Sequence, residues 1–254
     1  MQTLFISDLH LDNKRPEVIS YFTNYIKNLT DEIDSIYILG DFVEYWVGDD
    51  DPATGLKELF EEIKHKSKMY DIYFMHGNRD FMLSEKFCQN LGIKLLPDPS
   101  VITLYGKQIL VMHGDTLCID DVAYQEFRKL VRSESWQNEV LKKPLNERIK
   151  LAEDLRKKSL KETESKREII MDVNQQEVDK YFLKYNVDLM IHGHTHRPNI
   201  HITSLNGCKV KRIVLGDWYN SSFILKYHKD KVLIEFVNEI NEIYALINNY
   251  DRTI

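Results

Sequence analysis

The sequence predicts an α/β (α+β) fold, a single domain with a helical insertion. Over residues 1–115, short apolar runs alternate with stretches whose apolar residues recur at helical spacing. This alternation is typical of a mostly parallel sheet covered by helices on both faces. Residues 121–174 contain no strand signal and no glycine, and strand signals resume after them. We therefore expect one domain over residues 1–254, interrupted by a helical insertion at 121–174.

Five short apolar runs are the predicted strands of this sheet. A continuous apolar run is typical of a strand buried on both faces. Each run ends within a few residues of an Asp or a His, and the runs cover residues 3–6, 36–39, 72–75, 109–112 and 187–191. Ligands of open α/β sheets bind outside the carboxyl ends of the strands. We therefore expect the polar side chains that follow these strands to meet at one edge of one sheet.

Helices are predicted over residues 17–29, 56–68 and 84–91, where apolar residues recur at helical spacing. Ser84 is a suitable N-cap for the last of these helices, and Gly92 a suitable C-terminal stop. In the insertion we expect a helix with Pro144 near its start. Its apolar face is expected to contain Leu141, Leu145, Ile149, Ala152 and Leu155.

Two further strands are predicted after the fifth run, at residues 212–215 and 232–236. Residues 238–254 form a C-terminal tail, which is predicted to be an amphipathic helix. The prediction rests on four apolar positions: Ile240, Ile243, Tyr244 and Ile247.

Composition excludes several classes of protein. The apolar fraction of 43% and the charged fraction of 29% are those of an ordinary globular protein. A net charge of −6 disfavours a general nucleic-acid binder, although residues 127–168 carry 13 Lys/Arg against 8 Asp/Glu. The three cysteines give no disulfide framework, which favours a reducing compartment. We see no signal peptide and no run of about 18 apolar residues, so a bacterial cytoplasm is the expected location.

Metal-binding side chains follow all five predicted strands. The set contains carboxylate, amide and imidazole ligands but no thiolate: Asp8, His10, Asp41, Asn78, His113, His194 and His196. Any one of these residues alone is more simply explained as a turn residue or a satisfied core histidine. Together they form a donor set that suits Mn, Fe or Zn. Two divalent ions about 3.5–4 Å apart can clamp a phosphoryl group and activate water, and Asp41 is the candidate bridging ligand.

The order of these motifs resembles the calcineurin-like metallophosphoesterases. The motifs are Asp-x-His at 8–10, Gly-Asp at 40–41, Gly-Asn-x-Asp at 77–80, His-Gly-Asp at 113–115 and Gly-His-x-His at 193–196. The resemblance implies a β-sandwich flanked by helices. It also implies that one ion is held by Asp8, His10, Asp41 and His196 and the other by Asp41, Asn78, His113 and His194.

Arg79 departs from that superfamily, most members of which have His after the Asn of the Gly-Asn motif. Arginine cannot act as a general acid at neutral pH, but a permanent cation can stabilise charge on a phosphoryl oxygen. An acid matters least when the leaving group is itself a phosphate, whose second pKa is about 6. Arg79 therefore favours a substrate with a pyrophosphate bond.

Longer strings of sequence resemble one family within the superfamily, the UDP-2,3-diacylglucosamine pyrophosphatases of lipid A biosynthesis. They lie at residues 3–11, 37–41, 48–52, 76–81, 112–118, 170–175 and 191–198. The resemblance implies a hydrolase that acts on an acylated UDP-sugar with two divalent ions, most simply Mn²⁺. It implies catalytic roles for Asp41, Asn78, Arg79 and His113. It further implies substrate contacts from Asn78, Arg79, Asp121, Ser159, Thr163, Lys166 and His194, although position 163 commonly carries Asn in that family.

The insertion combines apolar and basic side chains, such as Phe127 and Trp136 with Arg156 and Lys158. From the pattern alone, an amphipathic helix pair packed on the core explains it. The resemblance implies instead a cap over the substrate. Basic helices near an anionic leaflet gain about 1 kcal/mol per Lys or Arg, so we expect a peripheral protein on the cytoplasmic face of the inner membrane.

Two other functions remain open at this stage. A different metallophosphoesterase could cleave dinucleotides or other phosphodiesters, and a non-catalytic scaffold could use the same fold. A scaffold has no need for seven metal-binding side chains, and all seven are present. The sequence does not indicate acyl length, the native metal or the oligomeric state.

Overall fold

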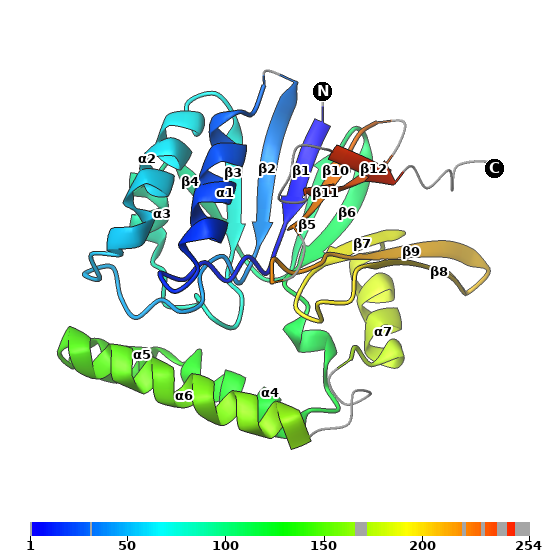
Figure 1. Ribbon diagram of the computed structural model, residues 1–254. Coiled ribbons are helices and arrows are strands. Elements are labelled where there is room, and N and C mark those ends of the chain that lie inside the picture. Colours follow the sequence, from blue (N-terminus) through cyan, green and yellow to red (C-terminus); the bar gives the residue numbers. More distant parts are fainter. Residues whose placement is uncertain are drawn as a thin grey trace.

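The computed structural model describes residues 2–30, 32–165, 172–219, 222–229, 232–237 and 243–246, with residues 160–165, 233–237 and 243–246 described for the backbone only. Its centre consists of two sheets, and helices cover their outer sides (Figure 1). One sheet has seven strands in the order β12-β11-β10-β1-β2-β3-β4, and the other has five in the order β5-β6-β7-β9-β8.

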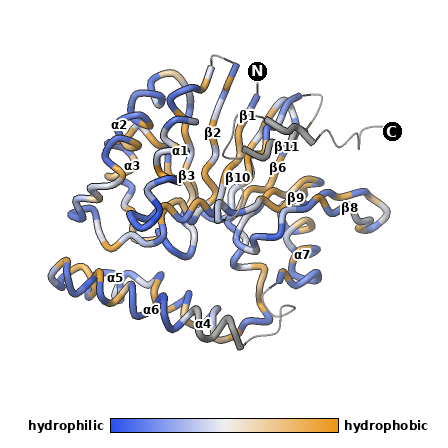
Figure 2. Tube along the Cα trace, in the orientation of Figure 1, coloured by the Kyte–Doolittle hydropathy of each residue, from blue (hydrophilic) through white to orange (hydrophobic). Residues whose placement is uncertain are grey.

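The first sheet has a parallel half and an antiparallel half. The parallel strands are β1 (Gln2–Ile6), β2 (Ile33–Leu39), β3 (Asp71–Met75) and β4 (Ile93–Leu96). The antiparallel strands are β10 (Ser222–Tyr227), β11 (Val232–Val237) and β12 (Ile243–Leu246). β1 and β2 are buried over nearly their whole length, as continuous apolar runs require. Figure 2 shows that hydrophobic residues are concentrated along the strands.

Three helices cover the outer face of the first sheet: α1 (Pro16–Lys27), α2 (Lys57–Lys66) and α3 (Glu85–Asn90), with the short 3-10 turn η1 (Thr54–Leu56) before α2. They bury an apolar stripe against the sheet, which for α1 includes Ile19, Phe22 and Ile26. Ser84 caps α3 by accepting a hydrogen bond from the backbone N–H of Phe87. Gly92 follows α3 at φ +73°, a left-handed conformation that favours glycine. Both capping predictions are confirmed.

The second sheet contains β5 (Ser100–Leu104), β6 (Lys107–Met112), β7 (Leu189–His192), β8 (Asn199–Leu205) and β9 (Cys208–Val214). One face packs on the first sheet, where Phe5, Tyr37 and Val111 share a buried cluster. The other face packs on α7 (Gln175–Tyr185), whose Val178 and Phe182 are buried against Leu110 and Met190. This is the β-sandwich flanked by helices that the family resemblance implied.

The insertion forms a third layer beneath the carboxyl ends of the strands (Figure 1). The turn η2 (Asp115–Leu117) precedes it, and its helices are α4 (Val122–Val131), α5 (Glu134–Leu141) and α6 (Leu145–Ser165). The side chains of Asp121 and Ser133 cap α4 and α5 by accepting backbone N–H hydrogen bonds. In the described residues no helix is long and apolar enough to cross a membrane.

Three expectations from the sequence are wrong. The five predicted strands lie in two sheets, because β5 pairs with β6 and no helix separates β4 from β5. Leu141 ends α5 and is exposed, because the chain turns at Lys142–Pro144 before α6 begins. Residues 243–246 form a strand on the edge of β11, where the helical prediction placed part of the tail. An unpaired strand edge and an Ile-Tyr-Ala-Leu segment favour strand pairing at that position. Residues 238–242 and 247–254 lie outside the described residues.

Candidate dinuclear metal centre

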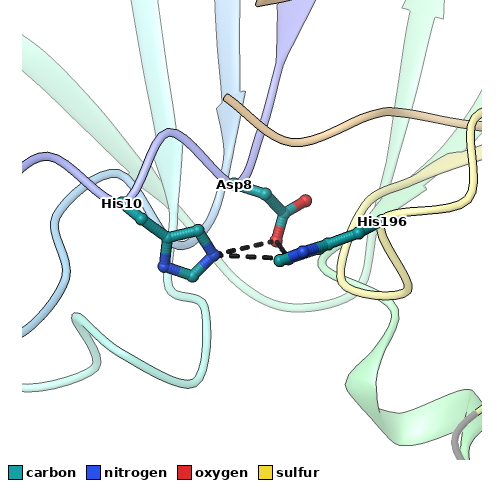
Figure 3. A group of neighbouring side chains, drawn as sticks. All are labelled: Asp8, His10 and His196. Atoms are coloured by element: carbon teal, nitrogen blue, oxygen red, sulfur yellow. Dashed lines mark hydrogen bonds and ion pairs between the residues drawn. The ribbon is translucent and has the colours of Figure 1, made fainter. Parts of the chain in front are cut away.

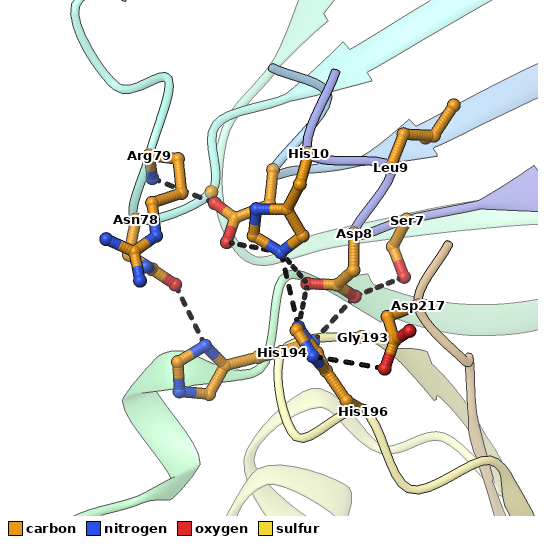
Figure 4. Close-up of polar contacts among 12 residues, drawn as sticks. Ser7, Asp8, Leu9, His10, Asn78, Arg79, Gly193, His194, His196 and Asp217 are labelled. Carbon is orange, nitrogen blue, oxygen red and sulfur yellow. Dashed lines mark hydrogen bonds and ion pairs between the residues drawn. The ribbon is translucent and has the colours of Figure 1, made fainter. Parts of the chain in front are cut away.

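All seven predicted metal ligands meet where the carboxyl ends of the two sheets converge. Figure 4 shows Asp8, His10, Asn78, His194 and His196 among them. Asp8 and His10 follow β1, Asp41 follows β2 and Asn78 follows β3. The second sheet supplies His113 after β6 and both His194 and His196 after β7. Asp8, His10, Asp41 and His113 are 2% exposed or less. The sandwich therefore brings together side chains that lie up to 188 positions apart (196 minus 8).

One group of donors surrounds His10 (Figure 3). Its Nε2 atom lies 3.3 Å from His196 Nε2, 4.0 Å from Asp8 Oδ1 and 3.7 Å from Asp41 Oδ2. His196 Nε2 lies 3.4 Å from the same Asp8 oxygen. Four donor atoms thus converge on one point, as a metal site requires.

A second group of donors surrounds His113. Its Nε2 atom lies 3.8 Å from Asp41 Oδ1 and 2.9 Å from the amide of Asn78, which is also 2.9 Å from His194 Nδ1. With the amide turned over, Asn78 would instead donate to both rings through its nitrogen. Asp41 therefore stands between the groups, with Oδ2 facing His10 and Oδ1 facing His113. This is the arrangement expected of a bridging carboxylate.

The backbone at these residues is strained. Five of the seven have positive φ: Asp8 (54°), His10 (48°), Asp41 (52°), His194 (68°) and His196 (54°). Such conformations are uncommon for residues other than glycine and cluster at functional sites. Gly40, at φ +86°, also permits close packing, because a Cβ there would lie 2.6 Å from the backbone of Gly77 and from His113 Nδ1.

The electrostatics of the cluster favour added positive charge. Burial alone would lower the pKa of His113, but Asp41 and Asp8 raise it to about 9. Burial would likewise lower the pKa of His196, but the neighbouring carboxylates of Asp217 and Asp8 raise it to about 10. Among the described residues, buried Asp8 Oδ1 has no hydrogen-bond partner. A divalent cation would supply the missing partner, so the residues present fit two metal ions.

Several supporting residues were not predicted from the sequence. Asp217 Oδ2 lies 3.2 Å from His196 Nδ1, and Glu44 Oε2 lies 3.1 Å from His10 Nδ1. Ser7 Oγ donates to Asp8 Oδ2 at 2.6 Å. Carboxylates on the outer nitrogens of metal-binding histidines commonly orient the rings. The only sequence signal for the two carboxylates was an acidic residue within a few positions of a strand end, which is too common to be specific.

His76 and His192 do not join the donor groups. His76 Nε2 lies 2.7 Å from the carbonyl oxygen of Leu83, and burial lowers the pKa of His76 to about 4. His192 Nε2 accepts from Arg212 at 3.0 Å, and its Nδ1 donates to the carbonyl oxygen of Gly193 at 2.8 Å. The second contact orients the loop that carries His194.

The cap helices and the metal-binding loops enclose a cavity of about 500 Å³. Its apolar lining comes mostly from the insertion and includes Phe81, Met82, Phe127, Val131, Trp136, Val140, Leu151 and Leu155. Of the predicted apolar face, Ala152 and Leu155 line the cavity, whereas Leu141, Leu145 and Ile149 are not part of this lining.

Cationic side chains also line the cavity. Five of the arginines that line it are paired. Four form ion pairs, Arg128 with Asp115, Arg148 with Asp50, Arg156 with Glu44 and Arg197 with Asp172, and Arg132 donates to the carbonyl oxygen of Gly77. Arg79 lies beside Asn78, and its backbone N–H donates to Asp41 Oδ1 at 2.8 Å.

The predicted substrate contacts are largely gathered around this cavity. Asn78, Arg79, Asp121, Ser159 and His194 all line it. Asp121 also caps α4, since its side chain accepts the N–H of Tyr124 at 3.1 Å. The side chain of Thr163 and the whole of Lys166 lie outside the described residues.

Similarity to known proteins extends over most of the chain. A family model described as calcineurin-like phosphoesterase matches residues 1–198. The chain is 44% identical over 232 residues to a UDP-2,3-diacylglucosamine hydrolase of Marinobacter nauticus, covering 91% of this chain and 95% of that protein. It is 43% identical over 234 residues to a protein of the same name in Stenotrophomonas maltophilia, covering 89% and 94%. Among solved structures, an archaeal phosphodiesterase matches at 13% identity with a TM-score of 0.46, covering 93% of this chain and 100% of that one.

Proposed function

The chain belongs to the calcineurin-like phosphoesterases and, among them, to the UDP-2,3-diacylglucosamine hydrolases, and from this premise we propose that it cleaves the pyrophosphate bond of UDP-2,3-diacylglucosamine. The products would be 2,3-diacylglucosamine 1-phosphate and UMP, as required in lipid A biosynthesis. The observation that carries the proposal is the cavity, which joins metal-binding, cationic and apolar side chains in one space. An acylated nucleotide sugar carries the three matching groups: a diphosphate, polar rings and acyl chains.

The apolar part of the lining distinguishes this substrate from a dinucleotide. Phe127, Val131, Trp136 and Leu155 face the cavity from the cap. A dinucleotide has no aliphatic chain to place against them, whereas burying acyl methylenes gains about 0.8 kcal/mol each. The full set of seven metal-binding side chains argues against a scaffold.

The reaction assigns a role to each catalytic residue. When bound, two divalent ions supply charge for the phosphoryl oxygens and lower the pKa of water. Asp41 would hold both ions, while Asn78 and His113 would complete the second site. Arg79 places a permanent cation beside the phosphoryl group, where it can stabilise developing charge without transferring a proton. Asn78, Arg79, Asp121, Ser159, Thr163, Lys166 and His194 are the proposed head-group contacts.

We propose Mn²⁺ as the resident ion, supported by the mixture of carboxylate, amide and imidazole donors without thiolate. We further propose that the protein acts as a peripheral protein at the cytoplasmic face of the inner membrane. The support is the substrate itself, whose acyl chains lie in the bilayer, together with the net positive charge of residues 127–168.

A panel of three substrate classes tests the proposal: an acylated UDP-sugar, a dinucleotide polyphosphate and a small nitrophenyl phosphodiester. We expect the acylated UDP-sugar to have the highest kcat/KM, and activity to disappear with chelator and return with Mn²⁺. Preference for the dinucleotide would assign the protein to another phosphoesterase activity. Absence of bound metal in purified protein would support a scaffold.

Replacing Phe127 by Ala should raise KM for the acylated substrate about tenfold, which corresponds to one lost apolar contact of about 1–3 kcal/mol. Phe127 lines the cavity and is 38% exposed, so the stability cost should be modest. Leu130→Ala on the same helix is the matched control, because Leu130 is 56% exposed and does not line the cavity. Steady-state kinetics with the acylated substrate and the small phosphodiester measure the effect. Equal relative losses with both substrates would show that the cap is only structural.

A further inference from the structure

Glu44 joins the cap to the metal centre. It follows the strand-end turn of Asp41 and is 12% exposed at its side chain. Its Oε2 atom lies 3.1 Å from Nδ1 of His10, the ring nitrogen that faces away from the other donors. Its Oε1 atom lies 2.6 Å from Nε of Arg156 on α6. One carboxylate therefore contacts a candidate metal ligand and a cap helix at the same time.

Tyr219 limits the freedom of this carboxylate. Its hydroxyl donates to Glu44 Oε2 at 3.1 Å and accepts from Arg156 Nη2 at 3.3 Å. Its ring stacks on His10 with centroids 5.1 Å apart and an interplanar angle of 25°. The Arg15 guanidinium lies over the same tyrosine ring at 4.5 Å and donates to the His10 carbonyl oxygen at 2.6 Å. Tyr219 and Arg15 thus restrain His10, and Tyr219 also restrains Glu44. Arg156 connects this group of contacts to the cap.

The charge of Glu44 suits both contacts. A glutamate carboxylate is ionised in neutral solution. It therefore attracts the Arg156 guanidinium at 2.6 Å and lies 3.1 Å from the outer nitrogen of His10. A carboxylate on the outer nitrogen of a metal-binding imidazole fixes the ring and increases its basicity.

Helix α6 is attached to the rest of the protein at two points, and the contact between Arg156 and Glu44 is one of them. Near its start, Arg148 pairs with Asp50 and donates to the carbonyl oxygen of Val47 at 2.5 Å. Two turns later, Arg156 reaches Glu44. Arg148 holds the helix to a surface loop, whereas Arg156 holds it to the residue behind His10. A shift of α6 would therefore move Arg156 and Glu44 and change the contact of Glu44 with His10.

We propose that Glu44 and Arg156 are positioning residues that couple the seating of the cap to metal binding at His10. With the cap seated, Arg156 holds Glu44 against His10, and the ion on the side of Asp8, His10 and His196 binds more tightly. Because linkage is reciprocal, that ion in turn stabilises the seated cap. The inference rests on the metal centre of the proposed function and adds a link between that centre and the substrate-covering helices.

The test uses calorimetry to measure Mn²⁺ binding to metal-free protein in the absence of substrate. The variants are Glu44→Gln, Arg156→Gln and the double variant, with Lys157→Gln as the matched control. Lys157 is the next residue of the same helix, 69% exposed at its side chain and 3.8 Å from exposed Asp154. We expect Glu44→Gln to raise the Kd of one of the two Mn²⁺ ions by at least about tenfold. Arg156→Gln should raise the Kd of the same ion by about fivefold, and the control should match the wild type.

The double variant separates coupling from two independent losses. If Arg156 acts through Glu44, the double variant should bind Mn²⁺ no more weakly than Glu44→Gln alone. Additive losses, or an Arg156→Gln variant equal to the control, would overturn the inference. Melting temperatures in chelator should stay within a few degrees of the wild type, so that weaker binding is not general destabilisation. Should Glu44→Gln fail to fold, Tyr219→Phe removes one hydrogen bond to Glu44, keeps the stacked ring and should raise the Kd of the same ion.

Hydrogen exchange of α6 is a readout independent of activity. Mn²⁺ should slow exchange in the described part of α6 in the wild type and in Lys157→Gln, but much less in Arg156→Gln. Equal protection in all three would overturn the coupling and leave the proposed hydrolase intact. A wild-type protein that binds no Mn²⁺ would overturn both the proposed metal centre and this coupling.

Discussion

Replacing Asp41 by Asn is expected to reduce turnover of the acylated UDP-sugar to below about 1% of the wild-type rate, since the bridging ligand of a two-metal site is lost. The reason is geometric. Asp41 is 2% exposed, with one oxygen 3.7 Å from His10 Nε2 and the other 3.8 Å from His113 Nε2. Asparagine has the same shape but carries no charge, and its nitrogen cannot accept, so one of the two donor groups loses its contact.

The measurement is kcat at saturating Mn²⁺ together with metal content by mass spectrometry. Asp34→Asn is the matched control, because Asp34 lies at the opposite end of β2 and accepts from Tyr105, a bond that an amide oxygen can keep. We expect the control to retain activity. An Asp41→Asn protein with two bound ions and more than about 1% activity would show that Asp41 is not the bridge.

The convergence of the seven candidate ligands was predictable because its signal was local. Each ligand follows an apolar run by one to five residues, so its position depends only on where a strand ends. The sequence could not indicate that the runs belong to two sheets. That outcome depends on the hairpin of β5 and β6. The hairpin is determined by pairing between the two strands, and none of the candidate ligands takes part in it.

Apart from Ser7, which bonds the adjacent Asp8, the residues missed by the sequence act across elements. Glu44 and Asp217 orient His10 and His196 from loops far away in the chain, and Arg156 reaches Glu44 from the cap. No spacing in the sequence encodes such contacts. The same limit explains the cap, where helical periodicity predicted an apolar face but could not indicate which of its members line the cavity. Leu155 does so, whereas Leu141 does not.

Arg79→Ala should lower kcat by about 100-fold or more, as removal of one electrostatic stabiliser typically does. The backbone N–H of residue 79 donates to Asp41 Oδ1, and alanine keeps that bond, so the variant should still bind metal. Five other arginines of the cavity are already paired with acidic groups or a carbonyl oxygen. We therefore expect that none of them replaces the Arg79 cation.

Arg79→His then decides what the cation does. If the leaving group is a phosphate, no general acid is needed, and the histidine variant should remain as slow as the alanine variant at pH 6 and at pH 8. Lys94→Ala controls for the loss of one positive charge, because Lys94 is 56% exposed and pairs with Asp71 at the start of β3, away from the site. Full recovery of kcat in Arg79→His would show that position 79 donates a proton. The substrate would then be an ester with a poor leaving group, because such an ester needs an acid and a pyrophosphate does not.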